Sequence, residues 1–153
     1  MAPFIVFTVT TLAALLSGTA GLPYAEGLPQ ALAIGLAAML ALTSGAHFHP
    51  TRRQGLIAIV PPRLLFPDHL VTLTGILEIL AAVGLLVPPT FLDWARPSAS
   101  FCLALLLIIM FPANVFAATE KRGKDSPDTP LLPRTLLQVL FVSAALIVGI
   151  ASL

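Results

Sequence analysis

The sequence predicts an all-α fold, a polytopic transmembrane helix bundle of about five helices, and two observations support this. Of the 153 residues, 58% are apolar and only 10% are charged, whereas soluble domains carry about 25% charged residues. Five long apolar stretches are also separated by segments rich in proline, glycine or charge. Because the open edge of a sheet cannot satisfy its backbone groups in lipid, the stretches are predicted to be helices. The length fits one transmembrane domain, residues 1–153.

The positions of the spans follow from the thickness of a membrane. Crossing ~30 Å of hydrocarbon at ~1.5 Å per residue requires about 20 mostly apolar residues. The stretches that meet this length, or nearly meet it, are residues 3–20, 29–48, 70–87, 99–118 and 135–153. Residues 51–66 contain an apolar run that is too short to span, which predicts an interfacial or re-entrant segment there.

The first stretch has an alternative interpretation as a cleaved signal peptide. A signal peptide begins with positive charge and has a short apolar core. Residues 1–11 contain no Lys or Arg, and the apolar run that follows is long. These features favour a retained span, although both interpretations stay open at this point.

The distribution of basic residues predicts the orientation. With five spans, residues 51–67 and 119–134 lie on the same side of the membrane. They hold seven of the eight basic residues, namely Arg52, Arg53, Arg63, Lys121, Arg122, Lys124 and Arg134, and the opposite side receives only Arg96. Since cytoplasmic loops are enriched in Lys and Arg, we expect a plasma or inner cell membrane protein with a cytoplasmic amino terminus and an external carboxyl terminus.

Glu78 is the clearest functional candidate, because an ionisable residue inside a span is costly unless it serves a purpose. It lies near the middle of the third stretch, one turn after Thr74. A carboxyl group at that depth must be protonated or paired. It is interpreted either as an acid that carries protons or contacts a ligand, or as a structural acid bonded to a neighbouring helix.

Polar residues in the other stretches extend this candidate site. Pro112 is expected to kink the fourth span, and Asn114 follows it. His47 and His49 end the second span, but their spacing makes a poor chelate, so hydrogen-bonded histidines are favoured over a metal or haem site. The single cysteine, Cys102, excludes an intramolecular disulfide and a CxxC pair. No metal site is predicted.

The predicted topology brings these residues together. His47, Thr74, Asn114 and Gln138 come from four spans and all fall in the cytoplasmic half, with Glu78 near mid-depth. Small residues permit close approach of helices in membranes, and the candidates for this role are Gly35, Gly45, Gly75, Ala145 and Gly149. We therefore predict a polar pocket that opens toward the cytoplasmic side.

Four blocks of sequence resemble the DoxX-like family of small membrane proteins. In order they are Gly45-Ala46-His47-Phe48, Ile59-Val60-Pro61-Pro62, Leu73-Thr74-Gly75-Ile76-Leu77-Glu78 and Phe111-Pro112-Ala113-Asn114. The resemblance implies a four-helix membrane core formed by the second to fifth spans, with the first span as an amino-terminal extension. It also implies a link to membrane oxidoreductase complexes, to sulfur or quinone chemistry or, in distant relatives, to chaperoning of membrane proteins. It assigns no catalytic role to the matching positions.

Three functions are compatible with these features. The first is an accessory or interaction subunit of a membrane complex, which fits the lack of soluble mass and of a cofactor fingerprint. The second is a membrane redox subunit that binds a quinone or another small lipophile, with Glu78 and His47 handling protons. The third, a small proton-coupled carrier, is less favoured because no inverted repeat is visible.

The same features limit which partners and which cofactors can be expected. Whether the protein is an enzyme stays open, and quinone is the cofactor that the second function would require. The expected partners are the lipid bilayer and another membrane protein or a second copy of the chain. A net charge of +1 gives no field for nucleic acid.

Overall fold

The computed structural model describes residues 2–119 and 130–153, and it is helical throughout, with no strand in these residues. Five of the helices are long and apolar enough to cross a membrane, which confirms the predicted fold class. The elements are α1 (Ala2–Thr19), the short 3₁₀ helix η1 (Pro23–Ala25), α2 (Leu28–Phe48), α3 (Pro50–Ala58), α4 (Pro67–Leu86), α5 (Ala95–Thr119) and α6 (Leu131–Ala151).

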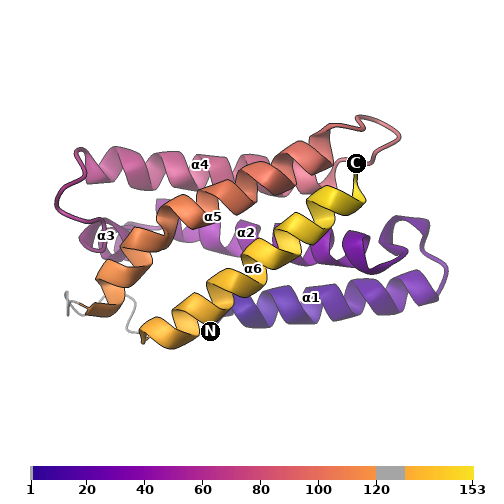
Figure 1. Ribbon diagram of the computed structural model, residues 1–153, viewed down its shortest axis with the longest axis horizontal. Coiled ribbons are helices and arrows are strands. Elements are labelled where there is room, and N and C mark those ends of the chain that lie inside the picture. The colour runs from indigo at the N-terminus through magenta and orange to yellow at the C-terminus, as the bar shows by residue number, and fades with distance from the viewer. Residues whose placement is uncertain (1, 120–129) are drawn as a thin grey trace.

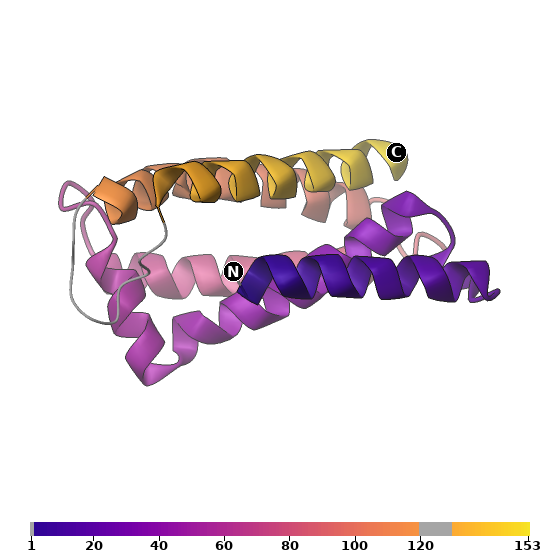
Figure 2. The same ribbon diagram turned by 90° about the horizontal axis from the view of Figure 1, so that it is seen from below.

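The long helices run back and forth and form two layers. Figure 1 shows that the chain reverses direction between each long helix and the next, so that α3 lies at one end of the bundle and the α4–α5 turn at the other. Viewed from the side, α5 and α6 form one layer, and α1, α2 and α4 form the other (Figure 2). We call the two ends the α3 end and the Trp94 end, after the exposed tryptophan that precedes α5.

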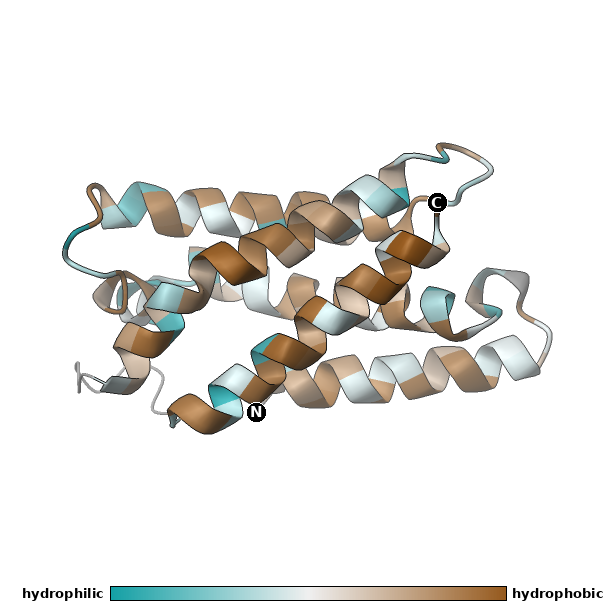
Figure 3. Ribbon diagram, viewed as in Figure 1, coloured by the Kyte–Doolittle hydropathy of each residue, from teal (hydrophilic) through white to brown (hydrophobic). Residues whose placement is uncertain are grey.

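The four-helix core predicted for the second to fifth spans is present. Helix α2 packs against α4 and α6, and α5 packs against both α4 and α6. Helix α1 lies outside this core, along α2, and reaches α6 through edge-to-face contact between Phe7 and Phe141, whose ring centroids lie 5.4 Å apart. Along the long helices most of the surface is apolar (Figure 3), as expected where lipid is the solvent.

Prolines explain why three helices start earlier than the sequence predicts. Helix α4 begins at Pro67, α5 begins at Ala95 with Pro97 in its first turn, and α6 begins at Leu131 with Pro133 in its first turn. The first turn has no intrahelical partner for its N–H groups, so a proline there costs nothing. Pro112 lies inside α5, which continues past it to Thr119. Residues 50–58 form a helix, α3, within the segment predicted to be interfacial.

Three of the predicted close-approach glycines have this role and one does not. A Cβ atom at Gly35 would lie 2.0 Å from Thr11 Oγ1, one at Gly75 would lie 2.7 Å from His47 Cβ, and one at Gly149 would meet the ring of Phe101 at 3.0 Å. The prediction for Gly45 is wrong, because a Cβ there would have no atom within 4 Å. Gly45 faces outward at the end of α2, where no helix crosses it.

Arginines hold both ends of the bundle together. At the α3 end, Arg53 donates to the carbonyl of His47 (3.1 Å), to the carbonyl of Asp68 (2.9 Å) and to the hydroxyl of Thr72 (3.0 Å). It thereby ties the end of α2 to the start of α4. Of the other basic residues assigned to this side, Lys121, Arg122 and Lys124 lie outside the described residues.

At the Trp94 end, Arg96 is buried, with 4% of its surface exposed. Its Nε donates to the carbonyl of Leu85 (3.1 Å), and its Nη2 donates to the carbonyl of Val87 (3.4 Å) and to the Tyr24 hydroxyl (3.3 Å). The guanidinium carbon also lies 5.6 Å from the centre of the Tyr24 ring. Arg96 therefore caps the end of α4, where the helix dipole favours a cation.

Candidate functional site

The site is built on one face of α4. Val71, Gly75 and Glu78 follow one another at helical spacing, and all three are buried. The ring of His47, from the last turn of α2, lies against Gly75, and its Cβ is so close that any side chain at Gly75 would displace it. The absence of a side chain at Gly75 therefore places the histidine ring between Val71 and Glu78.

His47 and Glu78 form a buried pair. His47 Nε2 lies 3.5 Å from Glu78 Oε1, and both side chains are 6% exposed. The other ring nitrogen, Nδ1, lies 2.7 Å from the carbonyl oxygen of Val71 and 3.2 Å from Thr74 Oγ1. The second carboxyl oxygen of Glu78 accepts a hydrogen bond of 2.7 Å from Thr43. Glu78 thus faces the interior of the bundle, where it contacts His47 and Thr43.

These contacts determine where hydrogens can lie. The Val71 carbonyl can only accept, so His47 Nδ1 carries a hydrogen in the observed arrangement. In a neutral ring Nε2 then has a lone pair directed at Glu78, and a charged carboxylate opposite it would be repelled. A hydrogen bond across this contact therefore requires one proton, either on Glu78 as a neutral acid or on the ring of an imidazolium–carboxylate pair.

A second polar cluster lies on α5 and α6. The Asn114 side-chain amide donates to Gln138 Oε1 at 2.7 Å, and Arg134 donates to Asn114 Oδ1 at 3.4 Å. The Gln138 amide also donates to the carbonyl of Leu107. Leu107 and Asn114 flank Pro112, the residue that interrupts the hydrogen bonding of α5. Asn114 and Gln138 are thus together, as predicted, but they do not contact Glu78 or His47 directly.

A cavity of about 330 Å³ joins the two clusters. We call it the interlayer cavity, because its lining includes residues of α2 and α4 from one layer and of α5 and α6 from the other. Its polar lining residues are Thr43 and Glu78 on one layer and Asn114, Arg134 and Gln138 on the other. The rest of its lining is apolar, and includes Leu40, Leu137 and Phe141. Polar groups thus converge from two sides on an otherwise apolar space.

A second cavity, of about 390 Å³, lies at the α3 end and is called the end cavity. Each of the four sequence blocks quoted above, which begin at Gly45, Ile59, Leu73 and Phe111, contributes to its lining. The residues are His47 from the first block, Val60 and Pro61 from the second, Thr74 from the third, and Pro112 and Ala113 from the fourth. Exposed Arg63 also lines it, so the cavity reaches the surface there. His47 and Glu78 therefore separate two cavities, with His47 facing one and Glu78 facing the other.

Two residues of this site were missed by reasoning from sequence. A lone threonine in an apolar helix is common, so Thr43 carries no signal of a site in the sequence. The charge of Arg134 indicates the orientation of the protein but does not by itself indicate a site. Both line the interlayer cavity. His49 and His69, by contrast, are exposed and lie outside it. Among the described residues, no group of three or more His, Cys, Asp or Glu side chains is arranged to hold a metal ion.

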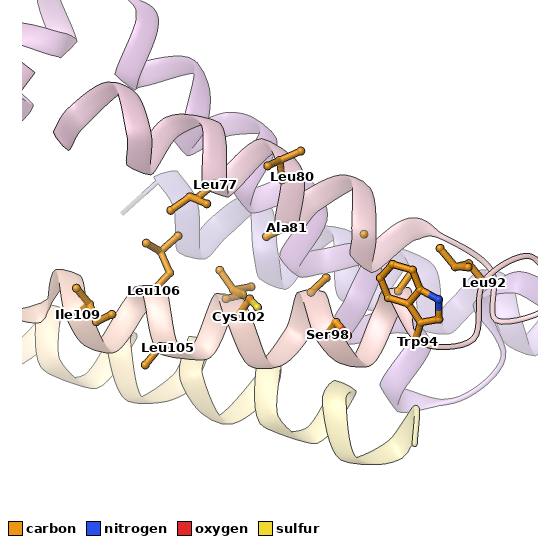
Figure 4. Close-up of a pocket in the computed structure, with 14 residues that line it drawn as sticks. Leu77, Leu80, Ala81, Leu92, Trp94, Ser98, Cys102, Leu105, Leu106 and Ile109 are labelled. Carbon is orange, nitrogen blue, oxygen red and sulfur yellow. The ribbon is translucent and has the colours of Figure 1, made fainter. Parts of the chain in front are cut away.

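A third hollow, of about 470 Å³, differs in character from these cavities. It is a groove between α4 and α5 toward the Trp94 end, and Figure 4 shows Trp94 at one end of its lining and Ile109 at the other. Its only side chains with polar atoms are those of Trp94, Ser98 and Cys102. The groove presents an apolar surface of the kind that faces lipid chains. Cys102 is the only titratable residue in its lining.

The fold and the site define a multi-pass helical membrane protein with polar groups buried in its core. Residues 36–149 match the profile of a protein family described as a domain of unknown function (DUF8561). The match covers more than half of the chain, so the chain belongs to this family. It extends from α2 to α6 and includes both polar clusters, whereas α1 lies outside it. Searches of curated proteins and of solved structures found no match.

Proposed function

We propose that this protein binds a small lipophilic molecule with a polar head group in the interlayer cavity. The observation that carries the proposal is the convergence of Glu78 and Thr43 from one layer with Asn114 and Gln138 from the other on one apolar space. Ligand sites are typically apolar cavities of roughly 300–1,000 Å³ with a few polar groups that fix orientation, and the volume of about 330 Å³ suits a single ring or a compact head group.

The arrangement of polar groups favours a quinone within this class. A quinone carries carbonyl oxygens on opposite edges of its ring, and the cavity offers polar groups on opposite walls. Glu78 can donate to one carbonyl when it holds the shared proton, and the positive charge of Arg134 lies on the other wall. A protein of this kind fits the predicted role as an accessory or interaction subunit of a membrane complex, because a subunit can hold the ligand for a neighbouring enzyme.

Binding of a short-chain quinone tests the proposal. Decylubiquinone is expected to raise the thermal unfolding midpoint of the detergent-solubilised protein, because a ligand that binds only the folded state stabilises it. Decanol, which has the chain without the ring, is expected to have no such effect. Glu78→Leu removes the group that donates to the ligand, and the loss of this hydrogen bond should weaken binding about tenfold.

The apolar groove of Figure 4 provides the matched control. Ser98→Leu adds an apolar side chain to that groove and leaves the interlayer cavity unchanged. We expect it to bind decylubiquinone as the unsubstituted protein does. If Ser98→Leu abolished binding while Glu78→Leu preserved it, the ligand site would be the groove, and the proposed function would be rejected.

We also propose the orientation that the basic residues predict, with the α3 end in the cytoplasm of a cell bounded by a plasma or inner membrane. Arg52, Arg53, Arg63 and Arg134 all lie at this end, and Arg96, the basic residue assigned to the other side, is buried. A reporter that is active only outside the cell should be active when fused after Leu153. The same reporter inserted between residues 120 and 130 should be inactive, and the reverse pattern would refute the orientation.

We also propose that this protein is related to the DoxX-like proteins. The support for this relationship is the position of the four blocks, which lie far apart in the sequence and all contribute to the end cavity. Residues that line one cavity are the ones a shared function would retain.

A further inference from the structure

We propose that Thr74, His47 and Glu78 form a path through which Glu78 exchanges its proton with the end cavity. The inference rests on the proposed function in one respect, because a ligand in the interlayer cavity is the molecule that Glu78 would serve. The path itself is defined by the protein's own groups. Glu78 lines the interlayer cavity, whereas Thr74 and His47 line the end cavity.

Two contacts between side chains connect the two cavities. Glu78 Oε1 lies 3.5 Å from His47 Nε2. The ring carries the path to Nδ1, which lies 3.2 Å from Thr74 Oγ1. In the observed arrangement the Thr74 hydroxyl donates to the carbonyls of Leu70 (3.0 Å) and Val71 (3.1 Å). It can also accept from Nδ1, and it can donate onward when it turns toward the end cavity that its side chain lines.

The transfer moves one proton and no electrons. The Oε1–H bond of Glu78 breaks as the Nε2–H bond of His47 forms. The Nδ1–H bond then breaks as its proton passes to the Thr74 oxygen, and the hydroxyl proton of Thr74 passes to a water molecule in the end cavity. Glu78 is left as a carboxylate that accepts from Nε2–H. Thr74 turns from the carbonyls of Leu70 and Val71 to donate to Nδ1, and the ring loses its hydrogen bond to the Val71 carbonyl. Reversal of the same steps restores the starting tautomer and carries a proton inward.

Among the described residues, three cations lie near the path. Arg63 lines the end cavity, Arg53 donates to the carbonyl of His47, and Arg134 lines the interlayer cavity. The carboxylate of Asp68 lies 3.8 Å from Arg53 Nη2. Cations are thus present at both ends of the path.

Two threonine substitutions of equal size test the path. Thr74 and Thr43 contact opposite sides of the His47–Glu78 pair, and each loses only its hydroxyl when it is changed to valine. The rate of proton exchange is measured by following the infrared band of the protonated Glu78 carboxyl after a pH jump, without ligand, with Glu78→Gln used to assign the band. Thr74→Val is expected to slow the exchange about tenfold or more, as for loss of one hydrogen bond in the transition state. Thr11→Val, which replaces a buried hydroxyl on α1 that lines neither cavity, is the control and should leave the rate unchanged.

Further variants separate a lost path from disturbed packing. Thr74→Ser keeps the hydroxyl and is expected to restore the rate, and Thr74→Ala replaces Thr74→Val if the latter does not give a folded protein. A slow rate in Thr43→Val with a normal rate in Thr74→Val would show that the proton comes through the interlayer cavity, and would overturn the inference. Absence of any Glu78-dependent carboxyl band would also overturn it. Because no ligand is present, failure of quinone binding would not affect the result.

Discussion

Arg96→Met is expected to lower the free energy of unfolding by about 3 kcal/mol, although Arg96 is a single residue remote from the candidate site. Methionine retains most of the apolar stem but cannot donate. The carbonyls of Leu85 and Val87 then lose their donor at the end of α4, in a place where the arginine is 4% exposed and water has little access. An unpaired buried carbonyl costs about 1–3 kcal/mol, and the stabilisation of the helix dipole by the cation is lost as well.

The measurement is the unfolding free energy in mixed micelles, titrated with a denaturing detergent. Arg63→Met serves as the control, since Arg63 is exposed and is expected to change stability by less than about 0.5 kcal/mol. Arg96→Lys separates charge from geometry. A lysine keeps the charge but not the forked donor, so it should recover only part of the loss. Equal stability of Arg96→Met and Arg63→Met would show that Arg96 does not cap α4.

This difference between two arginines shows where sequence reasoning reaches its limit. Charge counting assigned Arg96 to the side of the membrane opposite the other seven basic residues, and the structure places it at the end of the bundle opposite α3. Counting could not show that it is buried. That property depends on the turn Gly21–Gly27 bringing Tyr24 over the end of α4, a contact between residues 72 positions apart.

The helices could be predicted from the sequence because few backbone conformations satisfy their own hydrogen bonds in lipid. Each span needs a long apolar stretch, and proline and glycine separate the stretches, so the boundaries differ from prediction mainly where a proline lies in a first turn. The faces of the helices were harder to predict. Glu78 identified the buried face of α4 by itself, because a carboxyl cannot face lipid cheaply. Thr43 gave no such signal, since a threonine can satisfy its hydroxyl on its own helix, as it does on Leu40.

The candidate site was predicted in composition but only partly in arrangement. Five polar residues were expected in one pocket, and the structure divides them. Glu78, His47 and Thr74 form one cluster, whereas Asn114 and Gln138 form another across the interlayer cavity. The division depends on how far the two layers are separated, and helix periodicity carries no information about that distance.

A double substitution at the buried pair is expected to be less damaging than a single one. His47→Leu should lower the free energy of unfolding by roughly 3–5 kcal/mol, because it leaves the Glu78 carboxyl buried with Thr43 as its remaining partner. Glu78→Leu removes the acid and leaves His47 Nε2 without a partner, with a smaller loss because a neutral ring is cheaper to bury than a carboxylate. In His47→Leu/Glu78→Leu the two apolar side chains meet beside Gly75, and most of the lost stability should return.

Stability should return in the double variant because the free-energy cost of removing the two groups from solvent is about as large as the free energy of their attraction. Replacing both members of a buried ion pair by apolar residues is often neutral or stabilising, whereas removing one member is costly. The double-substitution cycle should therefore give a coupling energy above about 1 kcal/mol. The cycle of Asn114→Leu and Gln138→Leu is the matched control, because these side chains are neutral, partly exposed and 2.7 Å apart. Hydrogen-bonded pairs in membranes couple by about 0.6 kcal/mol on average. If the His47–Glu78 cycle were additive within that value, the two residues would not share a proton, and the buried acid would be satisfied by Thr43 alone.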